Sequence, residues 1–530
     1  MNKFMKRTTI GSVMRGMCYG FAALLFAASC ANDDVAQENK QKKDNIPAGT
    51  TVFTGTSLPD ATTRTAILNH TKGTGASVNW SSSDKIWVKD DGGTWQQSTA
   101  TIIPSVANKS FAKFALSGTY TGSSHDVLYT NTTVGTQPKV EIKAAQTQSA
   151  PNNFDHAGES GDFGIATSNK IGNVYNFTLN HKASYLCFIP RSSNPYVNRS
   201  KLIKVEIMSD DDIAGTYDIA ANGALTLASG GSKIITVTTG SGFDIDNSAD
   251  DMSKNATYAV VAPGTHKFRI RYWLRNTTDN PNGTIEGTVS KIITLNCTAG
   301  SIQDITANLD PHDYDGDHYY MWDAQNQYWA GHSSSQPKIN GGSSNDYPQN
   351  SSDTNNRWYN ESYPGYGVSN PATHTSCKDL PNANEMSWYC MYGDPRWDGD
   401  ELWTTMGHLY KGGMWFKKKS VLLAEGHYNT EKSADGTTDL RTTWKPYNNS
   451  GGSLHSGVPS AVDAGNYFYL PVLGWYLYGK LYGVASNGYY WSSSAHPGDS
   501  DAACALYFDH TSVLVYTYYR YYGFRLGVLL

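Results

Sequence analysis

Charged residues are scarce in this chain of 530 residues, at 17% of the total, and 42 basic side chains face 47 acidic ones. Without a basic excess the chain lacks the cationic surface that binds nucleic-acid phosphates, so we expect no nucleic-acid partner. Low charge combined with 12% aromatic residues excludes intrinsic disorder and a coiled coil rich in Lys and Glu. The length predicts about three domains of roughly 100–200 residues.

Signatures of common active sites are also missing. No stretch fits G-x-S-x-G, H-E-x-x-H, a P-loop or a dinucleotide fingerprint. Aspartates are plentiful, so a carboxylate pair for glycoside hydrolysis stays open, although their spacing does not favour one. We therefore expect no enzymatic activity, no cofactor and no metal.

Cysteines are few and none forms a Cys-x-x-Cys pair, which argues against a structural zinc site or a thioredoxin-like redox site. Cys187 in YLCFIP and Cys297 in IITLNC are expected to be small buried apolar residues. One disulfide among Cys377, Cys390 and Cys504 stays open.

Long apolar runs are absent beyond the first thirty residues. Residues 1–15 carry four basic residues and no acid, and residues 16–29 are apolar or small but too few to span a bilayer, as in an export signal (1–29). The segment Ala27-Ala28-Ser29-Cys30 resembles a bacterial lipobox, with Ala27 where Leu is usual. This predicts cleavage between Ser29 and Cys30 and acylation (palmitate) of Cys30, which anchors the chain in the outer membrane. A plain secretory signal cut near Ala28 is the alternative.

Residues 30–50 are polar and aperiodic, which predicts a disordered tether. Within them, Asp33 and Asp34 resemble the acidic tag of Bacteroides-type lipoproteins. That tag implies export to the cell surface, on the outer face of the outer membrane.

From residue 51 to 309, short runs of β-branched and aromatic residues alternate with Gly, Ser, Asn and Asp. Turn signals recur about every 8–15 residues, a spacing that favours β-sandwiches. The run KFRIRYWL (267–274) alternates basic and apolar residues, which predicts a strand with one face in water.

Several motifs of this region, in their order, resemble the fimbrillin family. They are Thr63-Arg64-Thr65, Asn79-Trp80, Asp84-Lys85-Ile86-Trp87-Val88, Phe177-Thr178-Leu179-Asn180-His181 and Tyr258-Ala259-Val260-Val261-Ala262-Pro263. The resemblance implies two transthyretin-like β-sandwiches, at 51–170 and 171–309.

The resemblance also implies a way of assembly. Fimbrillin precursors are cut after an arginine in the first strand, and the groove that this strand leaves binds an extended strand of the next subunit. Arg64 and Thr65 stand at the matching position. The implied partners are fimbrial shaft or adaptor subunits that donate a strand. An arginine exposed beside a strand is the alternative.

Aromatic residues concentrate after residue 310, where 26 of the 35 Tyr lie, so a different domain is expected at 310–530. The acidic run from Asp310 to Asp317 lacks the glutamate that an EF-hand needs, because Ala324 stands at loop position 12 counted from Asp313. We expect a hydrated linker there.

The tail carries ordered motifs that resemble the Fibrobacter succinogenes major paralogous domain. They are Leu380-Pro381-Asn382-Ala383-Asn384-Glu385-Met386-Ser387-Trp388, Tyr469-Leu470-Pro471, Gly488-Tyr489-Tyr490-Trp491-Ser492-Ser493-Ser494, Ala505-Leu506-Tyr507-Phe508 and Arg520-Tyr521-Tyr522-Gly523-Phe524-Arg525-Leu526. The resemblance implies an α+β domain with the C-type lectin-like fold, related to formylglycine-generating enzymes. Those enzymes use a late cysteine pair, whereas this chain has Cys504 alone.

Inside this tail, Asn382 and Glu385 have the spacing of a helix capping box. Trp388, Trp491 and Phe524 are expected in the core. The surplus tyrosines form a candidate ligand-binding face, with strand packing as the alternative. They are Tyr476, Tyr478, Tyr482, Tyr516, Tyr518 and Tyr519.

Together these features predict a non-enzymatic pilus tip subunit or adhesin, located on the cell surface or at the fimbrium tip. The C-terminal residues belong to a motif of the lectin-like domain, so we expect them not to be free to act as a donor strand. The expected ligand is a glycan or protein on a host or bacterial surface. A free-standing glycan-binding surface lipoprotein is the first alternative, and a surface enzyme the second.

We expect N-terminal sequencing of the mature surface protein to start at Thr65, because cleavage after Arg64 removes the lipidated leader. Every molecule starting at Cys30 would contradict this maturation.

Overall fold

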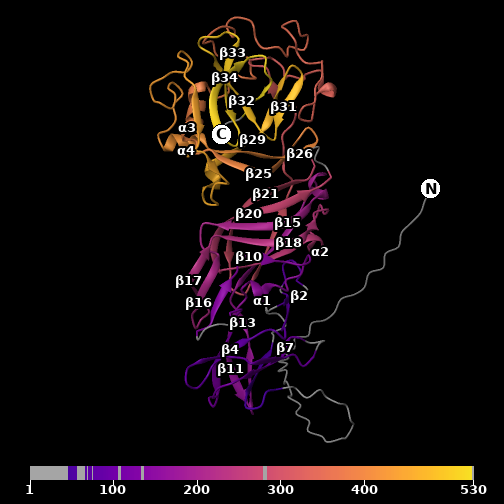
Figure 1. Cartoon of the computed structure of the whole chain (residues 1–530), viewed down its shortest axis with the longest axis vertical. Coiled ribbons are helices and arrows are strands. Elements are labelled where there is room, and N and C mark those ends of the chain that lie inside the picture. Colours follow the sequence, from indigo (N-terminus) through magenta and orange to yellow (C-terminus); the bar gives the residue numbers. More distant parts are fainter. Residues whose placement is uncertain are drawn as a thin grey trace, which may run out of the picture. The chain divides into compact units, whose positions relative to one another are not determined.

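The computed structural model describes residues 46–530 apart from 57–65, 69, 75, 106–108, 133–136, 279–282 and 528–530. Strands account for 45% of the described residues and helices for 7%, which confirms the expected mostly β class (Figure 1). Among the described residues no helix is both long and apolar enough to cross a bilayer. The expected signal, acylation and maturation residues Ser29, Cys30, Arg64 and Thr65 lie outside the described residues.

The first sheet contains strands from residues 51–181 and wraps around an apolar core that includes Phe53, Trp80 and Phe114. Its order is β5 (Trp95–Gln97), β4 (Ile86–Lys89), β8 (Ser124–Tyr129), β11 (Gly164–Ile171), β12 (Val174–Thr178), β1 (Thr51–Thr56), β7 (Phe111–Leu116) and β6 (Ala100–Ile102), with β13 (Asn180–His181) beside β11. A separate hairpin joins β2 (Ala66–Leu68) to β3 (Ser77–Asn79).

The second sheet is the longest and extends from the middle of the chain into its last third. Its order is β10 (Ala145–Thr147), β18 (Ile234–Asp244), β15 (Lys201–Ser209), β20 (Gly264–Asn276), β21 (Ile285–Cys297), β25 (Arg396–Thr405), β26 (His408–Lys417) and β29 (Tyr467–Pro471), with β23 (His312–Asp313) and β28 (His455–Ser456) beside β25. Two three-stranded sheets complete this region: β19 (Thr257–Val261), β14 (Ser184–Arg191), β22 (Ile302–Asn308), and β17 (Leu225–Ser232), β16 (Ala214–Ile219), β9 (Lys139–Ile142). Short helices α1 (Ala157–Ser160), α2 (Met252–Asn255) and η1 (Val197–Arg199) lie between these strands in the sequence.

The chain passes between the first two groups of sheets more than once. β9 and β10 pair with β16 and β18, whereas β11 and β12, which come later in the sequence, pair with β8 and β1. The strand pairing therefore does not divide the chain at the single boundary expected between residues 170 and 171. Local periodicity indicates where strands occur, but their partners are set by contacts distant in sequence.

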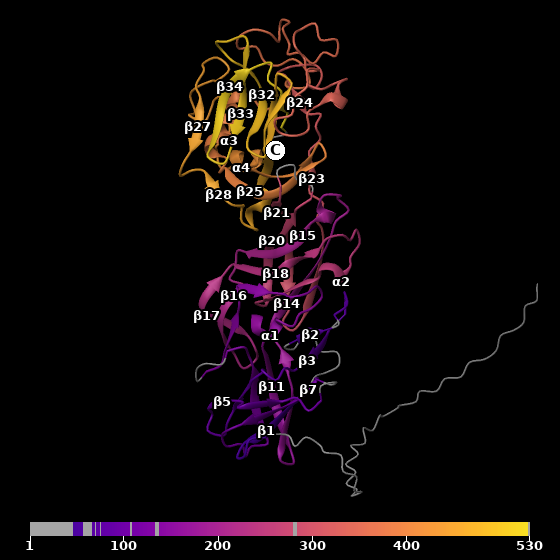
Figure 2. The same ribbon diagram turned by 45° about the vertical axis from the view of Figure 1, so that its right-hand side comes forward.

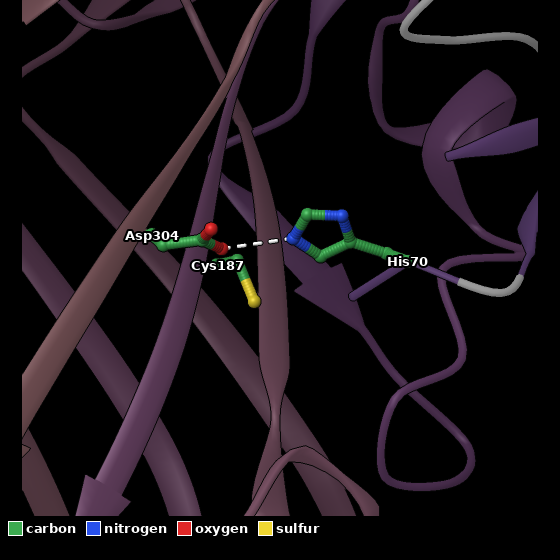
Figure 3. Close-up of side chains that lie close together, drawn as sticks. All are labelled: His70, Cys187 and Asp304. Atoms are coloured by element: carbon green, nitrogen blue, oxygen red, sulfur yellow. Dashed lines mark hydrogen bonds and ion pairs between the residues drawn. The ribbon is translucent and has the colours of Figure 1, made fainter. Parts of the chain in front are cut away.

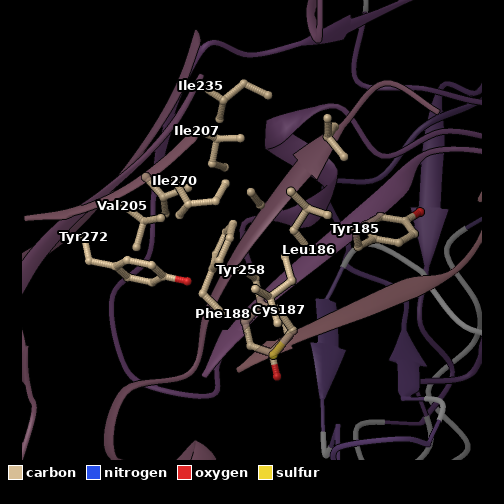
Figure 4. Packing of buried hydrophobic residues seen from close by; sticks show 14 of the residues in the cluster. Tyr185, Leu186, Cys187, Phe188, Val205, Ile207, Ile235, Tyr258, Ile270 and Tyr272 are labelled. Carbon is tan, nitrogen blue, oxygen red and sulfur yellow. The ribbon is translucent and has the colours of Figure 1, made fainter. Parts of the chain in front are cut away.

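The core between the sheets centres on β14, whose first seven residues are buried. Figure 4 shows its packing, with Tyr185, Leu186, Cys187 and Phe188 against Val205, Ile207, Ile235, Tyr258, Ile270 and Tyr272. The same cluster includes Leu402 of β25 and Leu409 of β26. The core thus continues past residue 310, where a separate domain is expected.

Two arginines on the basic face of β20 are buried, which corrects the expectation of a strand face in water. Arg269 and Arg271 are only 2% and 8% exposed, because residues of β25, of β26 and of the segment before β29 lie against them. Arg271 contacts the carboxylates of Glu206, Asp398 and Asp400 at 3.3–3.4 Å. The buried charge of Arg271 is tolerated because these carboxylates pair with it. Alternation of basic and apolar residues therefore also occurs in a strand whose polar face is covered by protein.

The acidic run at 310–317 is tied to the fold and is not a hydrated linker. The Asp310 carboxylate accepts hydrogen bonds from the Ser192 and Ser193 hydroxyls and from the Ser193 and Asn194 amides. These donors favour the charged form and lower the pKa of Asp310 to about 2. β23 then pairs with β25.

The last third adds a six-stranded sheet, visible in Figure 2 around β24, β27, β32, β33 and β34. Its order is β24 (Tyr319–Tyr320), β35 (Phe524–Arg525), β32 (Gly488–Ala495), β33 (Ala502–Phe508), β34 (Ser512–Tyr519) and β27 (Tyr447–Ser450), and β30 (Leu473–Leu477) pairs with β31 (Lys480–Val484). The helices are α3 (Ala383–Tyr392), α4 (Lys419–Ala424), η2 (Ser333–Ser335) and η3 (Asp463–Asn466).

Three sequence expectations for this region are confirmed. Asn382 and Glu385 form the capping box of α3. Trp388, Trp491 and Phe524 are buried. Among the described residues every cysteine is a buried free thiol, Cys187 and Cys297 included, so the disulfide left open among Cys377, Cys390 and Cys504 is not formed.

We expect Arg271→Met to lower the free energy of unfolding by about 3–5 kcal/mol, because it leaves the buried carboxylate of Asp398 without its cation. Arg275→Met is the matched control on the same strand, since Arg275 and Glu286 form a pair with side chains 41% exposed and its loss costs about 1 kcal/mol or less. Urea unfolding followed by tryptophan fluorescence measures both. Equal losses of unfolding free energy in the two variants would show that the buried ion pairs of Arg271 stabilise the fold no more than the exposed pair of Arg275 does.

Candidate functional site

The first candidate site is the place that β1 occupies. β1 is an interior strand of the first sheet: it pairs in parallel with β12 from Phe53↔Tyr175 to Thr56↔Thr178, and antiparallel with β7 from Thr51↔Leu116 to Thr56↔Phe111. Its backbone therefore has a partner strand on both edges.

Side chains hold β1 as firmly as its ladders do. The ring of Phe53 is buried, stacked on Tyr175 at 4.7 Å between centroids and edge-on to Tyr120 at 5.0 Å. Gly55 lies close beneath aromatic rings, since a Cβ there would lie 2.8 Å from the Phe177 ring. The strand thus fits a groove that accepts an aromatic side chain at one position and none at another.

The second candidate site is an aromatic pocket of about 310 Å³ near the end of the chain. Its lining residues are Met321, Tyr328, Tyr347, Pro348, Gln349, Trp358, Tyr478 and Tyr521. Tyr478 reaches it from the turn between β30 and β31, where φ of Tyr478 is 48° and φ of Gly479 is 74°. Gly479 is required there, because a Cβ would lie 2.0 Å from the Ser344 carbonyl oxygen.

The pocket's tyrosines are ordered by mutual contacts. The rings of Tyr478 and Tyr521 stack at 5.7 Å, with their hydroxyl oxygens 3.2 Å apart, and Tyr519 stacks on Tyr521 at 5.4 Å. Burial and the Tyr478 hydroxyl raise the pKa of Tyr521, so it remains a neutral phenol. Opposite, the Trp358 indole N–H donates to Glu361 at 3.0 Å. Flat apolar faces with hydroxyl and amide groups at their edges suit the face of a sugar ring or an aromatic peptide side chain.

Of the six candidate tyrosines, the structure brings Tyr478 and Tyr519 together, because both rings stack on Tyr521. Tyr478 is 61% exposed and Tyr519 is 49% exposed. Tyr476 is a correction: it is fully buried and its hydroxyl donates to the Pro337 carbonyl, so it packs the core. A ligand-binding role for the remaining five stays a prediction.

The other three candidates lie apart from this pair. Tyr482 stacks on Trp475 at 5.5 Å. Tyr516 contacts Trp444, and Tyr518 packs against Tyr489 and Phe524. The alternation of side chains along β34 separates Tyr516 and Tyr518 from Tyr519.

Sequence reasoning missed Tyr347 and Trp358, the pocket walls that come from the loop before α3. No local signal marks them, because they meet Tyr478 only through folding. Tyr521 stands in the Arg520–Leu526 motif, and the tyrosine crowding there was the available hint.

Residues able to hold a metal form two groups among the described residues. One is His70, Cys187 and Asp304, and the other is the exposed set Asp315, Asp317 and His318, whose members hydrogen bond to one another. Burial raises the pKa of Cys377, Cys390 and Cys504 to about 12, so none of these thiols is activated as a nucleophile.

No family model and no curated protein matches the chain. Solved structures from Bacteroides are similar to parts of it. A candidate cell adhesion protein of Bacteroides ovatus is 11% identical, covering 49% of this chain and 91% of its own, with a TM-score of 0.29. A second such protein, from Bacteroides uniformis, is 14% identical, covering 47% of this chain and 100% of its own, with a TM-score of 0.26. A fimbrial protein of Bacteroides ovatus is 13% identical, covering 52% of this chain and 52% of its own, with a TM-score of 0.23.

We expect Trp358→Ala and Tyr478→Ala each to weaken binding of the expected glycan or protein ligand by about fivefold or more, since stacking contacts of this kind contribute on the order of 1 kcal/mol or more each. Tyr363→Ala is the matched control, because Tyr363 is 88% exposed and does not line the pocket. A glycan and matrix-protein array followed by calorimetry on the best hit measures this. Identical binding by all three variants would exclude the pocket.

Proposed function

We propose that the chain is a surface fimbrial subunit, an adhesin that accepts a strand from a neighbouring subunit in the place of β1 and presents its aromatic pocket to a ligand. The observation that carries this proposal is the position of β1. An interior strand at the start of the described chain is followed directly by the segment 57–65, which contains Arg64. Cleavage after Arg64 would separate β1 from β2 and from the elements that follow it in the sequence.

Strand exchange follows from the chemistry of the vacated groove. Losing β1 leaves unpaired N–H and C=O groups on facing edges of β7 and β12, together with the apolar site of Phe53. Unpaired ladder groups beside an apolar pocket bind an extended strand, with the backbone providing affinity and the pocket choosing the side chain. The donor would carry a large apolar residue opposite Tyr175 and a glycine or other small residue at the position of Gly55.

We place the subunit at the fimbrium tip because its late strands are engaged within the fold. β35 pairs with both β24 and β32, and Tyr476 and Gly523 exchange backbone hydrogen bonds. A donor strand must leave its own domain, whereas this segment lies inside the six-stranded sheet. A tip subunit only needs to accept a strand.

The lectin-like identity of residues 310–530 belongs to the same proposal. Trp491 and Phe524, from two of the motifs, belong to one apolar cluster, in which their ring centroids lie 4.4 Å apart and Trp491 donates its indole N–H to the Tyr320 carbonyl. Outer-membrane anchoring through Cys30 completes the proposal and rests on the lipobox resemblance.

A free-standing glycan-binding surface lipoprotein is the second candidate. The aromatic pocket favours it, because binding there requires neither cleavage nor a partner strand. The two functions differ in whether β1 is replaced.

The test is coexpression with a fimbrial shaft protein, followed by immunogold labelling of purified filaments. We expect the wild-type chain at one filament end and Arg64→Ala absent from filaments, because β1 then stays in its groove. Arg199→Ala, a control arginine on the short helix η1, is expected to behave as wild type. Labelling along the whole filament, or equal incorporation of Arg64→Ala, contradicts the proposal.

A further inference from the structure

Three side chains form a row across the sheet β19–β14–β22. Cys187 of β14 is the register partner of Tyr258 on β19 and of Asp304 on β22. Directly paired residues on adjacent strands point to the same face of a sheet, so the thiol lies between a phenol and a carboxylate. The central position of β14 makes the spacing of this row a property of the strand register.

A fourth side chain covers this row from a distant segment of the chain. His70, which follows β2, places Nε2 2.8 Å from Asp304 Oδ1 (Figure 3). The amide of Gly73 donates to the other carboxylate oxygen at 2.7 Å, and the His70 ring lies edge-on to Tyr258 at 5.9 Å. The imidazole is thus fixed above the thiol and carboxylate by contacts on both sides.

The group is enclosed but reachable. The side chains of His70 and Asp304 are 2% and 14% exposed, and Cys187 is fully buried. One ligand atom from each of the three residues lies within 4.8 Å of the others. In a tetrahedral zinc site with bonds of about 2.0–2.3 Å, ligand atoms lie roughly 3.3–3.8 Å apart. An ion therefore fits between these atoms after small side-chain movements, and the exposed edge of Asp304 is its way in.

A nucleophilic role for Cys187 is the competing interpretation, and the surroundings disfavour it. A reactive thiol needs a cationic or otherwise stabilising environment that lowers its pKa. Here burial, followed by the charge of Asp304, raises the pKa of the Cys187 thiol. The imidazole hydrogen bonds to the carboxylate, so it is not aimed at the sulfur as a general base.

We propose that His70, Cys187 and Asp304 form a binding site for a zinc-class divalent cation, with the fourth position taken by water or the Tyr258 phenol. Imidazole nitrogen, thiolate sulfur and carboxylate oxygen are the zinc ligands of proteins, whereas Mg²⁺ and Ca²⁺ prefer oxygen alone. On binding, the thiol releases its proton to solvent and His70 coordinates through the neutral Nε2 lone pair.

The ion would clamp two distant parts of the chain. His70 follows shortly after Arg64, while Cys187 and Asp304 belong to the core sheet. A cation here would join the segment around His70 to the core sheet independently of β1. The site does not depend on the proposed fimbrial function, and metal binding tests it alone.

The experiment is a titration of the full chain, stripped of metal by a chelator, with Co²⁺ and then Zn²⁺. We expect one equivalent of Co²⁺ to give visible bands of a tetrahedral ion and a near-ultraviolet thiolate-to-cobalt band, both removed by Zn²⁺. His70→Gln and Asp304→Asn should weaken Co²⁺ binding by about tenfold or more, and Cys187→Ser should abolish the thiolate band. Cys297→Ser, the matched buried cysteine outside the group, should leave every signal unchanged.

A folding defect is separated from a lost site by the melting temperature without metal, which should be similar in wild type and His70→Gln. One equivalent of Zn²⁺ should raise the melting temperature of wild type and leave that of His70→Gln unchanged. The proposal is overturned if the folded chain shows no saturable Co²⁺ binding, or if binding survives His70→Gln and Cys187→Ser together. In either case the hydrogen bond between His70 and Asp304 serves only to attach the His70 segment to the core sheet.

Discussion

β1 satisfies its backbone hydrogen-bonding groups on both edges, against β12 on one side and β7 on the other. An interior strand is costly to remove because its partners are then left with unpaired N–H and C=O groups beside an open apolar site. The same cost is the physical basis of the proposed strand exchange, in which a strand of another subunit would replace β1. In that proposal, the stability of the first sheet and its binding of a partner strand both depend on the hydrogen bonds that β7 and β12 make to the strand between them.

The proposed exchange of β1 would leave the later strands in place. They are held by the core around β14, by the ion pair of Arg271 with Asp398 and by the hydrogen bonds to Asp310, and none of these interactions involves β1. The last third of the chain uses its aromatic residues in two ways. Trp491 and Phe524 are buried in the core, whereas Tyr478 and Tyr519 remain exposed beside a pocket. The proposed strand exchange and the proposed ligand binding therefore involve different residues of the chain.

Sequence patterns predicted the local features well. The α3 capping box, the buried Cys187 and the mostly β content follow from spacing, apolar neighbours and alternation. Sequence patterns failed to predict burial where it depends on contacts between residues distant in the sequence. The run 267–274 alternates as a strand with one face in water does, yet its two arginines are covered by residues distant in the sequence. Tyr476 is buried although it stands two residues from exposed Tyr478. The walls Tyr347 and Trp358 and the meeting of His70 with Cys187 are likewise products of folding, invisible to local periodicity.

The central claim is that β1 is replaceable in its groove. Hydrogen–deuterium exchange of the intact chain, the chain cut after Arg64, and the chain within filaments tests it most directly, because exchange reports the pairing of individual segments. The account predicts that amides of β7 and β12 facing β1 exchange slowly in the intact chain, rapidly after cleavage and release of β1, and slowly again in filaments. Unchanged protection of β7 and β12 after β1 has been released, or no renewed protection in filaments, would contradict it.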